Sequence, residues 1–331
     1  MAATRNLVSV VLPVHNEQES LAELYRELVH AIDGQPYDFE LIFVNDGSTD
    51  DSLEVIRGLH SRDPRVKCID LSRNYGHQAA LTAGTHAARG DAVVHMDADL
   101  QDPPSLLPVF LSKWRAGAEI VETQRVGERK PALKRILSAW FYRVFNRFSA
   151  TRIVPGGSDF RLLDRRCVDA LNALPERDRF LRGLTQWIGF SRELVTYEPG
   201  VRVAGTSSYT LRKSLELALD GLLHFSSLPL RASLCLGSAI VAACVIYLGF
   251  SLFSSLTSDM APQGWVDALV ILILMGGVNL VFTGVLSVYV WKIFDQIRAR
   301  PIYIVREAIG LEHIGVTGPE QGPVQTPTAS A

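Results

Sequence analysis

The sequence predicts an α/β domain with a parallel sheet, followed by two helices that cross a membrane. Three observations support this prediction. Short apolar runs alternate with helical periodicities in the first part of the chain, a pattern typical of parallel strands joined by helical crossovers. Polar residues gather directly after several of these runs. Two long stretches in the last third of the chain carry no charged residue, and each exceeds the roughly 20 residues that a transmembrane helix needs.

The strands and helices of the α/β domain follow from the periodicity of apolar residues. A continuous apolar run indicates a strand covered on both faces, and Leu or Ile at spacings of three and four indicates a helix. The expected strands are Val8–Val14, Phe39–Val44, Val66–Leu71, Ala92–Met96 and Glu119–Thr123, and the expected helices are Glu17–Ile32, Ser52–His60 and His77–Ala88. Because ligands bind beyond the carboxyl ends of parallel strands, we expect the functional site at that edge.

The stretch Gly90–Pro104 is the strongest candidate for chemistry. Asp97 and Asp99 follow the fourth expected strand, and side chains at i and i+2 of an extended segment point the same way. Both carboxylates are therefore expected to reach one divalent cation, which suits the binding of a diphosphate. Asp102 is expected to cap a helix that begins at Pro103. A chance Asp-x-Asp in a turn is the alternative, and the polar ends of the neighbouring strands favour the functional interpretation.

Composition and missing motifs exclude several classes of protein. The formal net charge is −2, so no overall basic field favours nucleic-acid binding. The four cysteines lack the spacing of a metal site, and we expect buried free thiols. A nicotinamide-dependent dehydrogenase needs Gly-x-Gly-x-x-Gly after its first strand, and this chain has Pro-Val-His-Asn-Glu at 13–17.

The last third of the chain predicts a transmembrane hairpin. Ala232–Ser258 and Ala268–Trp291 are the uncharged stretches. The loop between them carries two acids and no Lys or Arg, whereas both outer flanks are basic, so both termini are expected in the cytoplasm. Leu133–Phe148 combines an apolar helical stripe with four Lys or Arg and is expected to lie in the headgroup region; a core-facing helix is the alternative. Residues 206–231 are expected to form a juxtamembrane amphipathic helix.

Four ordered motifs resemble glycosyltransferase family 2, whose members have the inverting GT-A fold, a Rossmann-like α/β architecture. They are PVHNE at 13–17, VNDGSTD at 44–50, LSRNYGHQAALTAG at 71–84 and DADLQDPP at 97–104. Within the family, the chain is most similar to the polyprenyl-phosphate glycosyltransferases, which include GtrB-like bactoprenol glucosyltransferases and dolichyl-phosphate-mannose-synthase-like enzymes. GSDFRLLDRR at 157–166, FLRGLTQWIGF at 180–190 and the motif at 205–231 support the bacterial branch.

The resemblance covers roughly residues 7–306 and implies both an organisation and an activity. It implies a GT-A domain over 1–205, the juxtamembrane helix over 206–231, two transmembrane helices over 232–291 and a cytoplasmic tail over 292–331. The implied enzyme is an inverting hexosyltransferase of the bacterial cytoplasmic membrane, dependent on Mg²⁺ or Mn²⁺. It moves one sugar, expected to be glucose, from a UDP-sugar to undecaprenyl phosphate, and the resemblance suggests a homotetramer. The tail from Leu311 onward is expected to be disordered.

The same resemblance assigns roles to residues. Asp159 matches the carboxylate proposed as base, which we expect to orient the acceptor phosphate or accept its last proton. Asp97 and Asp99 match the metal-binding pair, and Arg125 matches a phosphate-contacting arginine. Substrate-binding positions are Pro13, His15, Glu17, Val44, Asp46, Asp97, Ala98, Gln101, Arg202, Ser208 and Lys213.

Two departures from the family pattern and two structural alternatives accompany these assignments. His15 stands where a Tyr is common, and Ser208 stands where a Lys is frequent, which makes Lys213 a candidate for the second cation. A turn histidine is the alternative for His15, and closure of the Asn45–Gly47 turn is the alternative for Asp46.

Three other functions remain open at this point. The transferred sugar could be GlcNAc, mannose or aminoarabinose. A processive polysaccharide synthase would need more membrane spans and a Gln-x-x-Arg-Trp signature, which this sequence lacks. A non-catalytic membrane protein could bind nucleotide sugars or aid lipid flipping, and the intact pair Asp97 and Asp99 argues against it.

Overall fold

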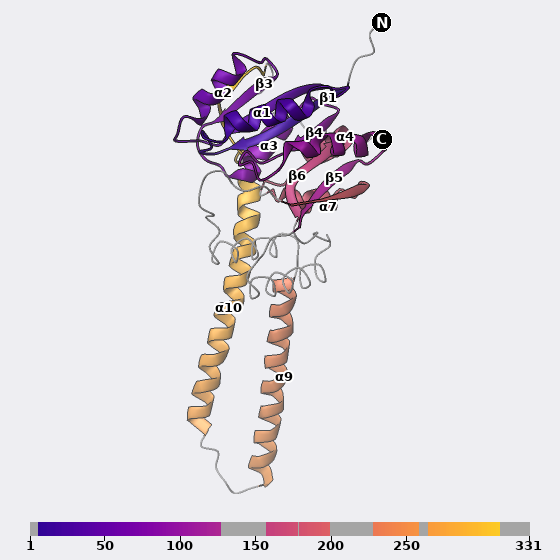
Figure 1. Ribbon diagram of the computed structural model, residues 1–331. Coiled ribbons are helices and arrows are strands. Elements are labelled where there is room, and N and C mark those ends of the chain that lie inside the picture. The colour runs from indigo at the N-terminus through magenta and orange to yellow at the C-terminus, as the bar shows by residue number, and fades with distance from the viewer. Residues whose placement is uncertain (1–5, 127–156, 178, 199–227, 258–263, 312–331) are drawn as a thin grey trace, which may run out of the picture. The chain divides into compact units, whose positions relative to one another are not determined.

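The computed structural model describes residues 6–126, 157–177, 179–198, 228–257 and 264–311 (Figure 1). The chain divides into two compact units. The first comprises residues 1–142, 151–208 and 300–331, and the second comprises 143–150 and 209–299. The expected interfacial helix at 133–148 and most of the expected juxtamembrane helix at 206–231 lie outside the described residues, as does the tail from 312.

In the described residues of the first unit, eight strands form a mixed sheet with the order β7-β5-β6-β4-β1-β2-β3-β8. Its strands are β1 (Leu7–Val14), β2 (Asp38–Asn45), β3 (Val66–Leu71), β4 (Ala92–His95), β5 (Ile120–Arg125), β6 (Gly157–Asp164), β7 (Arg192–Tyr197) and β8 (Val305–Ile309). β1 pairs in parallel with β2 and β4, β2 pairs in parallel with β3, and β7 with β5. β6 runs antiparallel to β4 and β5, and β8 antiparallel to β3. The predicted parallel arrangement of the first four strands is thus confirmed.

Helices cover both faces of this sheet. They are α1 (Leu21–Ile32), α2 (Ser52–His60), α3 (His77–Ala87), α4 (Leu107–Arg115), α6 (Arg165–Asn172) and α7 (Leu181–Trp187). Val8 and Val10 of β1 share a buried cluster with Leu24 of α1. Val11 points to the other face, where α3 approaches so closely that a Cβ on Gly84 would lie 2.2 Å from Val11 Cγ1. Because side chains alternate between the two faces along β1, α1 and α3 pack on opposite faces of the sheet.

The segment after β4 differs from the extended geometry expected for the Asp-x-Asp motif. β4 ends at His95, and Asp99 lies in a turn. Leu100 then has φ of +63°, a left-handed conformation that is uncommon for a residue with a side chain. The two carboxylates are consequently positioned by a tight turn at the strand end, so the prediction that both belong to one extended segment is wrong.

The chain returns to the first unit after its apolar helices, which the sequence analysis did not predict. β8, a strand in the expected cytoplasmic tail, pairs with β3 at the sheet edge. Arg306 donates a hydrogen bond of 2.6 Å to the Ser72 carbonyl. Tyr303 is 2% exposed and lies 2.9 Å through its hydroxyl from Nδ1 of His86 on α3. Residues 303–309 therefore belong to the α/β domain.

The described residues of the second unit form the long helices α9 (Leu228–Thr257) and α10 (Gly264–Arg298). Within α10, the 28 residues Ile271–Arg298 are long and apolar enough to cross a membrane, and they are not buried in the protein. The apolar stretch found in α9 among the described residues, Cys235–Tyr247, is shorter. Both expected spans are thus helical, one of them meets the length and composition of a transmembrane helix, and the hairpin stays a prediction.

Candidate active site

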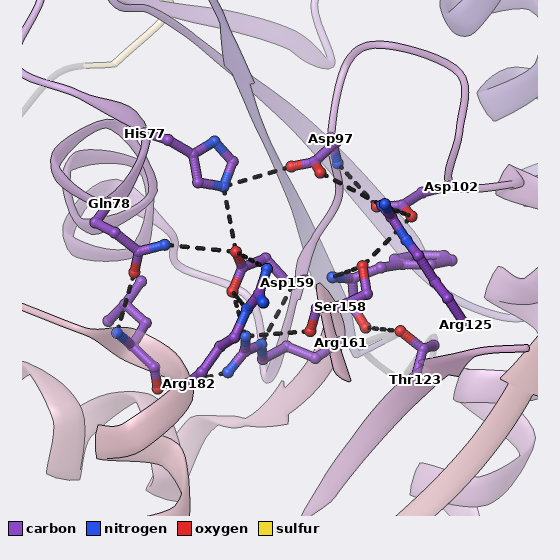
Figure 2. Close-up of polar contacts among 12 residues, drawn as sticks. His77, Gln78, Asp97, Asp102, Thr123, Arg125, Ser158, Asp159, Arg161 and Arg182 are labelled. Carbon is purple, nitrogen blue, oxygen red and sulfur yellow. Dashed lines mark hydrogen bonds and ion pairs between the residues drawn. The ribbon is translucent and has the colours of Figure 1, made fainter. Parts of the chain in front are cut away.

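The predicted chemistry lies where β4 ends and β6 begins. Because β6 runs antiparallel to β4, with Arg161 paired to His95, continuing that register places Asp159 opposite Asp97. Figure 2 shows dashed lines from one nitrogen of His77, the first residue of α3, to both carboxylates. His77 Nε2 lies 3.5 Å from Asp97 Oδ1 and 3.6 Å from Asp159 Oδ2. One imidazole nitrogen therefore joins the two predicted acidic groups.

The negative charge of Asp97 is only partly neutralised by its neighbours. No hydrogen-bond donor among the described residues reaches its buried Oδ1, and its Oδ2 lies 3.8 Å from Arg125 Nη2. Burial, reinforced by the charges of Asp102, Asp159 and Asp99 and opposed by His77, raises the pKa of Asp97 to about 6. A buried carboxylate whose ion-pair partners lie no closer than 3.5 and 3.8 Å is costly unless further positive charge neutralises it.

These residues fit a divalent metal that a ligand helps to hold. The described part of the chain has no group of three or more His, Cys, Asp or Glu side chains that could hold a metal alone. Asp97 and Asp99 offer carboxylate oxygens, the ligands that Mg²⁺ and Mn²⁺ prefer. Mg²⁺ sites in proteins commonly use one or two carboxylates together with water and substrate phosphates. Asp97 and Asp99 would therefore supply the protein's share of such a site.

Asp102 holds the side chain of Arg125 in place near Asp97. The Asp102 carboxylate is fully buried, accepts from Arg125 Nη2 at 2.9 Å and from the Tyr197 hydroxyl. Tyr197 in turn accepts from Arg125 Nε at 2.9 Å, and Arg125 Nη1 reaches Gln101 Oε1 at 3.3 Å. A 3₁₀ turn starts at Pro104 without a cap from Asp102. The predicted capping role of Asp102 is therefore wrong, because Arg125 and Tyr197 hold its carboxylate.

Asp159 is surrounded by donors. It is 5% exposed and accepts from Arg161 Nη2 at 2.5 Å, from Arg182 Nε and Nη2 at 2.9 and 2.8 Å, and from Gln78 Nε2 at 3.4 Å. Burial alone would raise the pKa of Asp159, but Arg182, His77 and Arg161 outweigh it and hold that pKa well below its ordinary value. Partial burial likewise opposes a charged His77, but Asp159 and Asp97 raise its pKa.

The residues expected to bind the nucleoside come together at the ends of β1 and β2. Pro13 pairs with Val44 across the two strands, and both are buried. Asp46 accepts backbone hydrogen bonds from Tyr75 at 2.7 Å and Gly76 at 2.9 Å. Its carbonyl lies 2.9 Å from Nδ1 of His15, which is exposed. Asp46 therefore connects the end of β2 to the start of α3. This structural role differs from both substrate binding and closure of the Asn45–Gly47 turn.

Of the remaining predicted residues, Glu17 and Ala98 are connected by hydrogen bonds through Ser20, and three others lie outside the described residues. Ser20 Oγ lies 2.9 Å from the Ala98 carbonyl and 3.1 Å from Glu17 Oε2, so α1 joins these two positions to the turn after β4. Arg202, Ser208 and Lys213 lie outside the described residues.

Sequence reasoning missed four side chains of this site: His77, Gln78, Arg161 and Arg182. All four lie within motifs used only to recognise the family, LSRNYGHQAALTAG, GSDFRLLDRR and FLRGLTQWIGF. Charged residues inside those motifs were a usable signal. Their partners, however, come from elements far apart in the chain, as in the pair of Gln78 Oε1 and the Leu181 amide at 3.0 Å.

Comparison with known proteins gives consistent matches. Residues 9–166 match the family described as glycosyl transferase family 2. The uncharacterized glycosyltransferase YkcC of Bacillus subtilis (strain 168) is 40% identical over 92% of this chain and 95% of its own. The SfII prophage-derived bactoprenol glucosyl transferase of Shigella flexneri is 35% identical over 91% of this chain and 98% of its own. Among solved structures, mannosyl-3-phosphoglycerate synthase of Rubrobacter xylanophilus matches with a TM-score of 0.45 and 16% identity over 78% of each chain.

Proposed function

The chain belongs to glycosyltransferase family 2, and from this we propose that it transfers one glucose from UDP-glucose to a polyprenyl phosphate at the cytoplasmic face of a bacterial membrane. The observation that supports this most is the 35% identity with a bactoprenol glucosyl transferase over 91% of the chain. That likeness extends far past the matched domain at 9–166 and takes in the apolar helices, as an enzyme with a lipid acceptor requires.

The reaction that we propose is a single displacement. An oxygen of the acceptor phosphate attacks the anomeric carbon of glucose, the bond from that carbon to the UDP oxygen breaks, and UDP leaves with the electron pair. Attack from the face opposite the leaving group inverts the anomeric configuration. Because a phosphate monoester is largely deprotonated at neutral pH, with a second pKa near about 6, the enzyme's main tasks are positioning and charge neutralisation.

We assign the donor to the acid-rich side of the site. Asp97 and Asp99 would hold Mg²⁺ or Mn²⁺, which when bound supplies Lewis-acid stabilisation of the diphosphate. Arg125 lies 3.8 Å from Asp97, and its contacts with Asp102 and Tyr197 preset its orientation toward an anionic leaving group. Gln101 would contribute beside it.

The nucleoside is assigned to the ends of β1 and β2. Pro13, Val44 and Asp46 would line the uracil pocket, with His15 and Glu17 at its edge. Asp46 already accepts two backbone hydrogen bonds, and a carboxylate has about four lone-pair sites, so capacity for a base nitrogen remains. Ala98 would contact the ribose and phosphate. Arg202 and Lys213 would add positive charge near the acceptor.

A transfer assay tests the proposed function. Purified full-length protein is incubated with undecaprenyl phosphate, Mn²⁺ and a panel of radiolabelled UDP-sugars, and label is counted in the organic phase. We expect label from UDP-glucose in a product whose sugar is released by mild acid. Label only from UDP-GlcNAc or another donor would correct the sugar, and no lipid-phase label from any donor would contradict the function.

A further inference from the structure

The two arginines around Asp159 have different tasks. Arg161 is 2% exposed, and its guanidinium is used inside the protein by Asp159, by the Ser158 carbonyl at 3.3 Å and by Thr185 Oγ1 at 2.9 Å. Arg182 has a side chain that is 38% exposed. Of the two, only Arg182 is placed to meet a ligand from solvent.

Asp159 fixes the orientation of Arg182. Nε of Arg182 donates to Oδ1 at 2.9 Å and Nη2 donates to Oδ2 at 2.8 Å, so two parallel charge-assisted hydrogen bonds set the plane of the guanidinium. Asp159 itself is held by Arg161 and by Gln78, whose Oε1 accepts from the Leu181 amide. Asp159 therefore holds Arg182 in one orientation through two hydrogen bonds, which Figure 2 shows.

Acidic side chains outnumber arginines around Asp97 but not around Asp159. Arg125 Nη2 lies 3.8 Å from the carboxylate of Asp97 and 2.9 Å from that of Asp102. Arg161 and Arg182 form ion pairs with Asp159, and the negative charge of Glu122 also acts on Arg161. The Asp97 side of the site therefore suits a cation, whereas the Asp159 side presents the exposed guanidinium of Arg182 to an anion.

We propose that Arg182 binds the phosphate of the polyprenyl acceptor and that Asp159 is a positioning residue that acts through Arg182. This inference rests on the proposed function, which makes the acceptor a lipid phosphate. The phosphate carries the charge opposite to that of the Arg182 guanidinium, and the planar guanidinium can bind it with two hydrogen bonds.

The electrostatics of Asp159 agree with a positioning task. A carboxylate whose pKa lies well below its ordinary value is a weak proton acceptor, because base strength falls with pKa. The acceptor phosphate needs little help to lose its proton. Asp159 consequently does more for the reaction by holding Arg182 than by removing a proton.

Steady-state kinetics of the full-length protein test the proposal. The variants are Arg182→Gln, Arg182→Lys and Asp159→Asn, with Arg166→Gln as control, since Arg166 lies on α6 with a side chain that is 75% exposed. Arg182→Gln should raise the KM for undecaprenyl phosphate by about 10- to 100-fold, the loss expected for hydrogen bonds to a charged group. The KM for UDP-glucose should stay within about twofold. The control should leave both constants unchanged.

Asp159 is tested by coupling and by pH dependence. Asp159→Asn should raise the same acceptor KM, and the double variant should be no worse than Arg182→Gln alone, because both changes remove one interaction. The rate of Asp159→Asn should keep the wild-type pH profile. UDP-induced thermal stabilisation reports folding, and Arg182→Lys, which keeps the charge but not the planar fork, should still show a several-fold higher acceptor KM.

Several results would overturn the proposal while leaving the function intact. An active wild type whose acceptor KM is unchanged in Arg182→Gln and Arg182→Lys would remove Arg182 from the acceptor site. An increase in the UDP-glucose KM instead would move Arg182 to the donor. Loss of the acidic limb of the pH profile in Asp159→Asn would make Asp159 the base. A wild type that transfers no sugar to any polyprenyl phosphate contradicts the proposed function itself.

Discussion

Replacement of Asp97 by Asn should stabilise the metal-free protein. The pKa of Asp97 rises from 3.8 to about 6, chiefly through burial, and each pKa unit corresponds to about 1.4 kcal/mol. The charged carboxylate therefore costs the folded state up to about 3 kcal/mol at pH 7. Because the folded pKa is the higher one, Asp97 favours folding below pH 3.8 and loses that contribution as pH rises through about 6.

The assay is thermal unfolding in detergent with EDTA, at several pH values. At pH 7.5 the melting temperature of Asp97→Asn should exceed that of the wild type by several degrees, and the gap should shrink as pH falls from 6 toward 4. Mn²⁺ with UDP should raise the melting temperature of the wild type only. Asp38→Asn, at an exposed carboxylate, is the matched control and should shift nothing. A less stable Asp97→Asn at pH 7.5 without metal would refute the reasoning.

Two further substitutions test the supports of the site. Tyr197→Phe removes the hydroxyl between Asp102 and Arg125 and should lower kcat/KM about tenfold, the effect of one hydrogen bond to a charged group; unchanged kinetics would show that Arg125 needs no such support. Tyr303→Ala should cost about 3 to 5 kcal/mol of unfolding free energy as a buried aromatic truncation, whereas Tyr303→Phe, which loses only the bond to His86, should cost about 1 kcal/mol. Equal melting temperatures for the two variants would contradict this packing.

The local spacing of apolar residues was sufficient to predict some helices and strands with their bounds. Ser52–His60 and Val66–Leu71 fold with the predicted bounds, because apolar periodicity alone fixes a helix and a buried strand. The start of α1 at Leu21 instead of Glu17 shows what periodicity omits, since the amides of Ser20 and Leu21 both donate to the Glu17 carbonyl in a turn.

The features that the sequence did not predict depend on contacts between segments that are far apart in the chain. β8 is a strand only because β3 lies beside it, about 240 positions earlier in the chain. Asp102 has the local pattern of a helix cap, yet Arg125 and Tyr197 from two other strands hold its carboxylate. Arg182 meets Asp159 through the packing of α7, which no spacing in the sequence reveals.

The central claim is that the carboxylates of Asp97 and Asp99 together hold the cation that binds the donor diphosphate. Anomalous scattering from crystals grown with MnCl₂ and UDP measures this directly. The account predicts one strong manganese peak within about 2.5 Å of carboxylate oxygens of both aspartates and of the UDP diphosphate. UDP bound with no manganese at these residues, or manganese ligated elsewhere on the α/β domain, would contradict it.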